Sequence, residues 1–332
     1  MKLNDGEEMV LKPYLQLIAL NILGAINPIK HHKNLPGSVS DNAERPISIR
    51  TYIGDDQVTH PKVLFFENGF GGYKYWMAYT TFPWGIDRFE NPCIAYSTDG
   101  YKWHDIENNP IDDAKGDGYF SDTHLVYRED TNKLECWYRY VSNVKKKPVH
   151  EVLYRQISSD GINWCEKETI YDNDSGDYAM LMSPCIIYDG DKYNVFTVSN
   201  VGGHHIDYYS YDGREFVKEN SISFPKGEFY IWHIDVASIA DGQAILMMCK
   251  SRADSPSKKW KLFIAKGSAE NGYKEPVTVL EGRDGAWDEQ LYRSSFVKVG
   301  NDWRVYYSGI SNNRRRGVGV ITSSVLNDYL GS

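Results

Sequence analysis

The sequence predicts an all-β protein, a five-bladed β-propeller with a short N-terminal helical extension, and three observations support this fold class. The first is a repeated motif, because Ser-Thr-Asp-Gly-Tyr-Lys-Trp at 97–103 returns at 158–164 and, weakened, at 210–216. The second is the interval between the Asp residues of the copies, 61 and then 52 residues, which suits one four-stranded sheet per repeat. The third is composition, because 14% aromatic residues and 28 Gly favour strands and turns.

The first 45 residues form a separate helical extension and connector, and the propeller is predicted over 46–332. Residues 14–26 are apolar, but acidic residues precede them and no small-residue cleavage site clearly follows, so we do not expect a signal peptide. The stretch is also too short and too interrupted to span a bilayer. We expect a helix that docks either on the propeller or on a partner chain. In the second case residues 10–30 would attach the chain to a second copy or to a larger assembly.

Five similar units follow this extension. Their first strands are predicted at 61–65, 123–127, 184–188, 236–240 and 295–299, and their second strands at 74–80, 134–140, 193–199, 244–250 and 303–308. Five incomplete sheets are most economically stacked around an axis. The fifth unit ends after a third strand at 318–322, so the alternating segment 47–53 is predicted to supply its fourth strand and close the ring.

Composition and charge exclude some classes of function. The net charge of -8 argues against a nucleic-acid-binding protein, which would usually be basic. Five widely spaced Cys residues, with no CxxC motif or Cys/His cluster, predict mostly buried free thiols and neither a metal site nor a cofactor. This use of cysteine fits folding in a reducing cytoplasm.

The chain resembles the five-bladed propellers of the glycoside hydrolase family 43 superfamily and its relatives in families 32, 68 and 117, and also the propellers of phage and prophage tail proteins. The resemblance covers roughly residues 55–325 and rests on His60-Pro61-Lys62-Val63, on 74–80 and on the Ser-x-Asp-Gly-x-x-Trp motif. It implies a carboxylate base opening blade one, a pKa-tuning Asp opening blade three and a Glu acid from blade four. The corresponding positions here are His60, Ser183 and Asp235, so two of the three expected groups are absent.

A rearranged acid/base pair is the alternative that keeps hydrolysis. Inverting hydrolysis needs one proton-bearing and one ionised group on opposite sides of the sugar. The candidates for catalysis are His60, Asp122, Asp235 and Glu289, and His60 qualifies because histidine titrates near neutrality. Each of them has a structural alternative, because a buried Asp or His near a propeller axis often bonds the backbone N–H groups of the next blade.

The strand openings and the loops between second and third strands are expected to gather on one face, which we call the funnel face. These loops carry clusters of cations at 145–147, 250–252, 258–259 and 314–316, which favour an anionic glycan such as teichoic acid. The candidate ligand-binding residues on this face are Trp84, His124, His204, Trp232, His233, Tyr292, Arg293, Arg252, Arg314 and Arg315. The repeated Asp-Gly motifs lie on the opposite face, where Asp99 and Asp160 are expected to form turns.

We therefore expect a carbohydrate-recognition propeller of a phage-like receptor-binding or tail protein, which binds an anionic cell-surface glycan and inserts into no membrane. Such a protein is made in the cytoplasm without a signal peptide and leaves the cell in the virion. The alternatives are an inverting glycoside hydrolase of the family 43-like type that acts on an oligosaccharide or polysaccharide, and an intracellular sugar-processing propeller with no viral connection.

Overall fold

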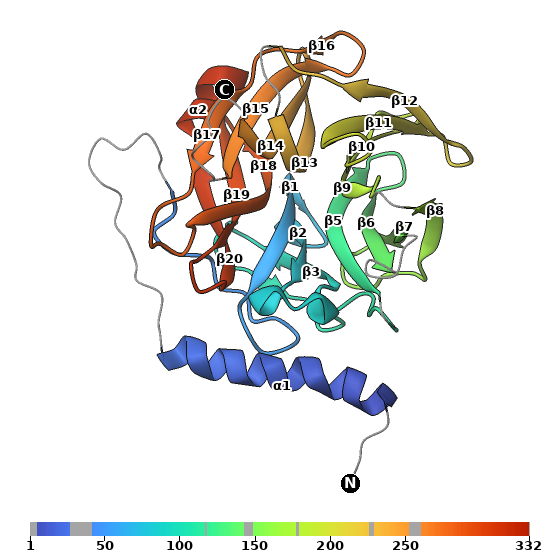
Figure 1. Ribbon diagram of the computed structural model, residues 1–332. Coiled ribbons are helices and arrows are strands. Elements are labelled where there is room, and N and C mark those ends of the chain that lie inside the picture. The colour runs from blue at the N-terminus through green and yellow to red at the C-terminus, as the bar shows by residue number, and fades with distance from the viewer. Residues whose placement is uncertain are drawn as a thin grey trace.

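The computed structural model describes residues 5–26, 42–116, 118–142, 149–176, 179–225, 229–251 and 260–331. These residues form a five-bladed β-propeller with a helix at the N-terminus, so the predicted fold class is confirmed (Figure 1). The first strands of the five blades contact one another around the ring, and the later strands of each blade lie progressively further out.

The blades are antiparallel sheets in chain order. Blade one holds β1 (Val58–Phe70), β2 (Tyr73–Thr81), β3 (Pro92–Ser97) and β4 (His104–Asp105), and blade two holds β5 (Tyr119–Arg128), β6 (Lys133–Ser142), β7 (Val149–Ser158) and β8 (Glu168–Gly176). Blade three holds β9 (Met182–Tyr188), β10 (Tyr193–Ser199), β11 (His205–Tyr211) and β12 (Phe216–Ile222). Blade four holds β13 (Phe229–Ile239), β14 (Gly242–Ser251), β15 (Lys261–Ser268), β16 (Gly272–Tyr273) and β17 (Val277–Glu281). Blade five holds β18 (Gln290–Val299), β19 (Asp302–Ile310) and β20 (Arg316–Thr322). The helix α2 (Ser324–Leu330) follows blade five.

Apolar side chains fill the gaps between neighbouring blades. In the described residues, one buried cluster lies at each of the five blade interfaces. Between blades one and two, for example, Trp76 and Tyr138 are fully buried. Because each sheet buries both faces against its neighbours, the strands read as apolar and aromatic runs, which is why the sequence reveals five of them.

The repeated motifs form turns, as the sequence predicts. The Asp99 carboxylate accepts the backbone N–H groups of Tyr101 and Lys102, at 2.7 Å each, and the indole N–H of Trp103 donates to the carbonyl of Gly100. The second copy repeats these bonds around Asp160. Both carboxylates therefore hold the turn that precedes the fourth strand.

The prediction that 47–53 forms the fourth strand of blade five is wrong. Blade five has three strands, and the segment 42–53 runs along β20 with one backbone bond, from the N–H of Ile47 to the carbonyl of Val318 at 2.8 Å. Pro46 packs against Gly317 and has no N–H to donate to a ladder. The segment still covers the edge of the blade, because Ile49 is fully buried in the cluster between blades five and one.

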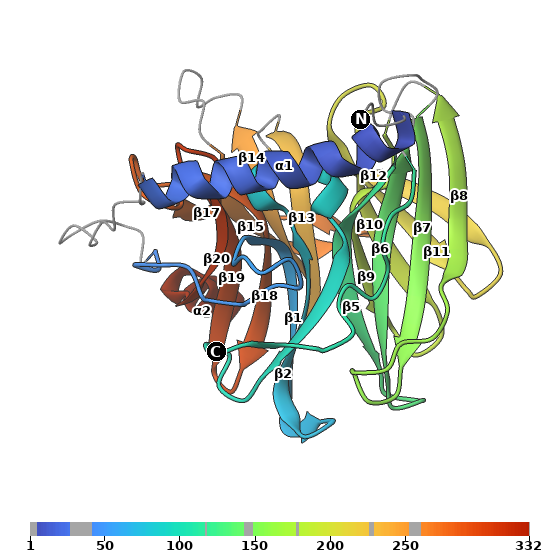
Figure 2. The ribbon, with the colours of Figure 1, turned by 90° about the horizontal axis from the view of Figure 1, so that it is seen from below.

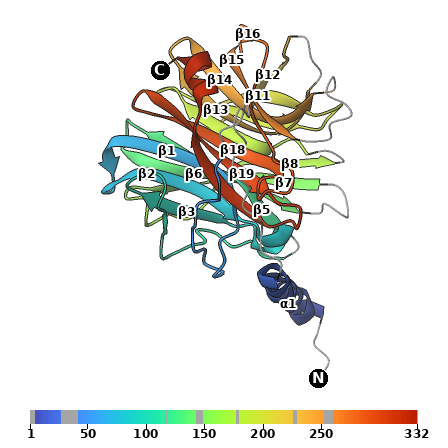
Figure 3. The ribbon, with the colours of Figure 1, turned by 90° about the vertical axis from the view of Figure 1, so that its left-hand side faces the viewer.

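The helix α1 (Asp5–Ile26) lies outside the ring, beside the connection from β2 to β3, which contains the short 3-10 turns η1 (Pro83–Gly85) and η2 (Asp87–Phe89) (Figures 1, 2 and 3). Leu17 is buried against Trp84 and its neighbours, and the Trp84 indole donates to the Asn21 side chain at 2.8 Å. No helix among the described residues is long and apolar enough to cross a membrane. The domain boundary at residue 45 stays a prediction, and the first propeller strand begins at Val58.

All five cysteines are free thiols, as the sequence predicts. Four of them are buried in strands, and Cys165 is exposed on the turn before β8.

Candidate functional site

The inner strands carry β-bulges where they approach the axis on the funnel face. His60, Asp122 and Ser183 have positive φ angles of 53°, 57° and 51°, and each lies at a shift in the pairing register of its strand. β13 and β18 show register shifts at corresponding places. Positive φ is costly for residues other than Gly, and such strain gathers at functional sites. The bulges therefore direct one side chain from each inner strand to a common point.

Two tiers of buried residues result, because side chains two positions apart point to the same side of a strand. The first tier comprises His60, Asp122, Ser183, His233 and Arg293, and the second tier comprises Lys62, His124, Cys185, Asp235 and Ser295. This register corrects the expectation from the sequence, which placed Asp235 at the position that corresponds to His60. Side chains two positions apart lie on the same side of a strand, so an alignment by apolar pattern does not distinguish Asp235 from His233.

Asp122 is the centre of the first tier. Its Oδ2 accepts the backbone N–H of Ser183 at 3.1 Å and lies 3.1 Å from the Arg139 guanidinium. Its Oδ1 lies 3.4 Å from His233 Nδ1, 3.3 Å from Arg293 Nη1 and 3.7 Å from His60 Nε2. One carboxylate oxygen is thus held by the protein, and the other faces two imidazoles and an arginine.

His60 is fixed from behind by groups that the sequence prediction missed. Its Nδ1 lies 2.8 Å from Thr80 Oγ1 and 3.1 Å from the carboxylate of Glu90, which follows η2 and also accepts the Ser121 hydroxyl at 2.8 Å. A carboxylate beside Nδ1 favours the proton on that nitrogen and leaves the Nε2 lone pair facing Asp122. No motif marks Glu90 in the sequence, because it lies in a loop.

Arg139 and Glu151 were also missed, although they leave a signal. They are charged residues beside apolar neighbours in β6 and β7, and Arg139 Nη1 lies 2.8 Å from Glu151 Oε1. Glu151 Oε2 accepts the backbone N–H of Met180 at 2.7 Å. Both side chains are buried, and a buried charge is rarely without a partner, so such residues indicate a buried network.

Several polar atoms of the first tier lack a hydrogen-bond partner within the part of the chain that the structure describes. They are His60 Nε2, Asp122 Oδ1, Arg293 Nη1 and both ring nitrogens of His233. One donor atom each from His60, Asp122 and His233 lies within 4.8 Å of the others. Buried polar atoms are almost always paired, so a concentration of five such atoms indicates a place for an ion or a polar group of a ligand. Two imidazoles and a carboxylate are ligands typical of zinc and similar divalent metals.

Burial and neighbouring charges tune these groups. Burial tends to raise the pKa of Asp122, but Arg139, followed by His233 and His60, lowers that pKa well below its usual range. Burial lowers the pKa of His233 to about 3, against the opposing effect of Asp122. At neutral pH the first tier therefore presents an ionised carboxylate beside a neutral imidazole, the protonation states that metal binding requires.

The second tier is largely satisfied by its own contacts. Lys62 Nζ donates to Asp235 Oδ1 at 2.7 Å, and Asp235 Oδ2 accepts the backbone N–H of Phe296. His124 Nε2 lies 3.1 Å from the carbonyl of Ile186, while its Nδ1 has no hydrogen-bond partner among the described residues. Asp235 thus supports the axis, with Lys62 as its counter-ion.

The remaining candidates lie at various distances from this cluster. Tyr292 packs against both imidazoles, with its ring 4.4 Å from that of His233. Trp84 is buried under α1 instead of facing the funnel, because Asn21 and Gly24 cover its ring. Glu289 accepts the N–H of Gly285 in the connection before β18.

The cations of the funnel face differ in their surroundings. Arg315 pairs with Asp56 at 2.6 Å, Arg314 is exposed, and Arg316 stacks on Phe82. Arg252 and the clusters at 145–147 and 258–259 lie outside the described residues.

An aromatic wall leads outward from the cluster along blades three and four. Trp232 precedes His233 in the chain, and its ring stacks on that of His204 at 5.2 Å. His204 in turn contacts the ring of Tyr230 at 4.0 Å, and Trp260 lies beside both Trp232 and Tyr230. Flat aromatic faces beside a polar cluster are typical of small-molecule sites.

No protein-family model matches the chain. The chain is similar to a curated protein of Flavonifractor plautii, the A type blood N-acetyl-alpha-D-galactosamine deacetylase, with 26% identity over 357 residues. The match covers 90% of this chain and 45% of the relative, so this chain spans a little under half the length of that protein.

Solved structures share the propeller. The crystal structure of an N-acetylgalactosamine deacetylase from F. plautii, in complex with blood group B trisaccharide, matches with a TM-score of 0.68 and 22% identity, and covers 91% of this chain and 96% of that chain. The family 32 β-fructofuranosidase of Bombyx mori has a TM-score of 0.61 and 13% identity, with 93% and 67% covered. A family 43 protein from Bacillus licheniformis has a TM-score of 0.57 and 14% identity, with 80% and 52% covered. These matches confirm the predicted resemblance in fold.

Proposed function

We propose that this chain is a metal-dependent hydrolase that removes the acetyl group from an N-acetylated amino sugar of a glycan. The observation that carries the proposal is the convergence at the propeller axis of one donor atom each from His60, Asp122 and His233, which lie within 4.8 Å of one another and make no hydrogen bond to the described residues. The class of substrate follows from the similarity, over 90% of this chain, to a protein named as an N-acetylgalactosamine deacetylase.

The donor set fits a divalent cation. His60 offers Nε2 because Thr80 and Glu90 occupy the other side of its ring, and Asp122 offers Oδ1 because Ser183 and Arg139 occupy Oδ2. Backing of this kind orients metal ligands in known sites. When bound there, the ion would supply Lewis-acid polarisation of the substrate carbonyl and activation of water.

Formal charge supports the same conclusion. The two tiers and their direct partners hold four carboxylates, Glu90, Asp122, Glu151 and Asp235, and three cations, Lys62, Arg139 and Arg293. With neutral imidazoles the cluster therefore carries a formal charge of -1, which an added cation offsets. Burial raises the pKa of Glu90, although His60 opposes this effect.

Hydrolysis of an acetamide adds water to the carbonyl carbon and breaks the C–N bond, giving acetate and the free amine. The carbonyl oxygen becomes negative in the transition state, and donors already aimed at that oxygen lower the barrier. Arg293 Nη1 would supply such a donor, because Nη2 is anchored on the carbonyl of Pro184 while Nη1 points into the cluster, 3.3 Å from Asp122 Oδ1. His233 makes no hydrogen bond through Nε2 to the described residues, its Nδ1 faces Asp122 Oδ1 at 3.4 Å, and burial lowers its pKa to about 3.

Two of the three functions considered from the sequence are competing outcomes of the test. For glycoside hydrolysis, Asp235 is unsuited to serve as acid or base, because Lys62 and the N–H of Phe296 take both of its oxygens. A phage-type protein that binds an anionic glycan without cleaving it would use the cations of the funnel face. Arg315 supports this role less than expected, because it already pairs with Asp56.

The test is to incubate the full chain with N-acetylgalactosamine and N-acetylglucosamine glycosides and to measure both acetate and reducing sugar. We expect acetate release that chelation abolishes and that Zn²⁺, Mn²⁺ or Co²⁺ restores. Asp122→Asn should lower acetate release at least 100-fold, roughly the loss seen when an essential electrostatic group is removed. Asp99→Asn, on the turn far from the funnel, is the matched control and should leave the rate unchanged.

Three results would contradict the proposal. Activity that survives complete chelation would exclude a required metal. Reducing sugar without acetate would indicate glycoside hydrolysis. Retention of an anionic glycan with neither product would favour the binding role.

A further inference from the structure

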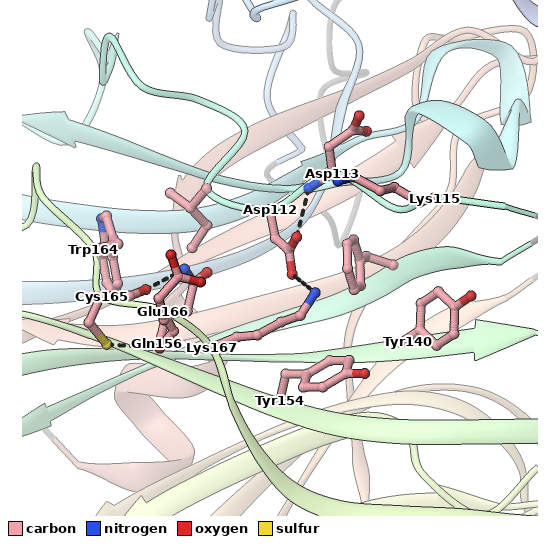
Figure 4. A pocket seen from close by; sticks show the side chains of 12 residues that line it. Asp112, Asp113, Lys115, Tyr140, Tyr154, Gln156, Trp164, Cys165, Glu166 and Lys167 are labelled. Atoms are coloured by element: carbon pink, nitrogen blue, oxygen red, sulfur yellow. Dashed lines mark hydrogen bonds and ion pairs between the residues drawn. The ribbon is translucent and has the colours of Figure 1, made fainter. Parts of the chain in front are cut away.

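A cleft of about 570 Å³ lies away from the axial cluster, on the side of blade two that faces blade one (Figure 4). Its cause is the shortness of β4, which has two residues where β8 has nine. Blades diverge outward, so a short outer strand leaves the face of the next sheet uncovered. Residues 106–116, in the connection that follows β4, cover part of this face, and the cleft lies between them and blade two.

Aromatic rings form one side of the cleft. Phe120, Tyr140 and Tyr154 lie on the same face of blade two. Phe120 pairs with Tyr140 on the next strand, Tyr140 pairs with Val152, and Tyr154 lies two residues after Val152. Trp164 lines the cleft from the turn between β7 and β8, where its indole is held by the carbonyl of Gly161. Tyr140, Tyr154 and Trp164 are half-buried, so parts of their surfaces reach solvent.

An ion pair divides the cleft. Lys167 Nζ donates to Asp112 Oδ2 at 2.7 Å and lies 4.8 Å from the centre of the Tyr154 ring. Figure 4 shows this pair between Trp164 and Tyr140. Asp112 also accepts the Tyr138 hydroxyl at 2.9 Å, so the pair is a fixed part of the wall.

Other polar groups of the cleft are available to bind the polar groups of a ligand. Among the described residues, the hydroxyls of Tyr140 and Tyr154 and the charged ends of Lys115 and Glu166 have no hydrogen-bond or ion-pair partner in the protein. The cleft thus combines aromatic faces with both donors and acceptors. Sugars require this combination, because their C–H groups pack on the electron-rich ring faces while their hydroxyls need partners of both kinds.

We propose that this cleft is a second glycan-binding site, which holds a neutral sugar unit of the polymer or oligosaccharide on which the axial site acts. The choice of a glycan as ligand rests on the proposed function, whereas the cleft itself does not depend on the axial cluster. A few contacts join the cleft to the axial cluster. Asp113 of the cleft accepts hydrogen bonds from Arg88 and Asn91, which lie on either side of Glu90 in the loop from β2 to β3. Two sites on one glycan raise the effective concentration of substrate at the axis.

The experiment measures binding of an N-acetylgalactosamine-terminated trisaccharide to the full chain in excess chelator, by calorimetry and saturation-transfer NMR. We expect a Kd of roughly millimolar strength, typical of a single weak site. Tyr154→Ala should weaken binding roughly ten-fold through the lost ring contact, and Tyr154→Phe should weaken it less. Asp122→Asn, at the axis, should change the Kd less than about two-fold, within the scatter of independent sites.

A second variant guards against misfolding of Tyr154→Ala. Glu166→Ala alters an exposed residue at the edge of the cleft and should weaken binding several-fold in a protein with an unchanged melting temperature. Absence of binding in chelator, binding insensitive to both cleft variants, or binding lost in Asp122→Asn would each overturn the proposal. Failure of acetate release would not affect these readings, so failure of the axial function and failure of the cleft are distinguishable.

Discussion

The carboxylate of Glu90 lies 3.1 Å from Nδ1 of His60, and it comes from the connection between β2 and β3, not from an inner strand. The same connection holds Trp84, on which α1 docks. A loop residue, together with Thr80 of β2, therefore occupies Nδ1 of His60, and Nε2 faces Asp122. The axial cluster depends on this loop as well as on the five inner strands.

Glu90→Gln tests this dependence. The amide keeps the shape of the side chain but removes the charge that favours a proton on His60 Nδ1, so the Nε2 lone pair becomes a poorer ligand. We expect metal affinity to fall roughly 10- to 100-fold, the usual loss when an outer partner of a metal ligand is removed. Competition with a chromophoric chelator measures it.

Glu289→Gln is the matched control, because Glu289 lies before β18 and bonds the N–H of Gly285. Its affinity for metal should equal that of the original protein. Equal affinities for all three proteins would show that Glu90 does not orient His60.

Asp105 predicts a pH dependence of stability in blade one. Burial raises the pKa of this carboxyl to about 6, although the Tyr79 hydroxyl and Asn109 oppose the effect. Between its ordinary value of 3.8 and about 6, the folded protein binds a proton that the unfolded chain has lost. The contribution of Asp105 to stability is therefore present below pH 3.8 and is lost as the pH rises to 6, by about 3 kcal/mol at most.

Asp105→Asn should remove this slope, since the amide does not titrate. Urea unfolding at several pH values gives the free energy of unfolding for both proteins. The difference between them should grow in favour of the variant from pH 4 to about pH 6 and then stay constant. A difference independent of pH would contradict the raised pKa.

The fold could be predicted from the sequence because each blade repeats one apolar pattern and a turn motif that bonds itself. Asp99 and Asp160 act locally, so the sequence alone is sufficient to interpret them. The closing strand could not be predicted in this way. Residues 47–53 alternate like a strand, but Pro46 beside Gly317 and the single bond from Ile47 hold the segment against β20 without a ladder.

The candidate site was predictable only in part. His60, Asp122, His233 and Arg293 are all candidates from the sequence, and the structure brings them together. Their use as a cation site was not predictable, because the ligands come from three blades and show no metal-binding spacing. The apolar pattern repeats every two residues along a strand, so Asp235 was placed one tier too high, at the level of His233.

Docking of α1 is tested by a pair of leucines. Leu17 is 7% exposed and packs against Trp84, whereas Leu15, two residues earlier, is 57% exposed. Leu17→Ala should lower the free energy of unfolding by about 2 to 3 kcal/mol, as for other buried leucines. Leu15→Ala should change it by less than about 0.5 kcal/mol. Chemical denaturation measures both, and equal effects would show that α1 does not dock through Leu17.

The aromatic wall predicts how the substrate is held. Trp232 lies between His233 and the rings of His204 and Trp260, so a sugar whose acetamide reaches the axis would lie against its ring. Trp232→Ala should raise the KM for acetate release roughly ten-fold, because the lost stacking acts on the bound sugar. The value of kcat should change much less, since the axial ligands remain.

Tyr101 provides the comparison for that variant. It is an exposed aromatic residue, 46% accessible, on the turn far from the funnel, where it packs under Arg304. Tyr101→Ala should leave both KM and kcat unchanged. A fall in kcat with KM constant in Trp232→Ala would mean that the ring positions His233 instead of the sugar, and chelator competition would then show a matching loss of metal affinity.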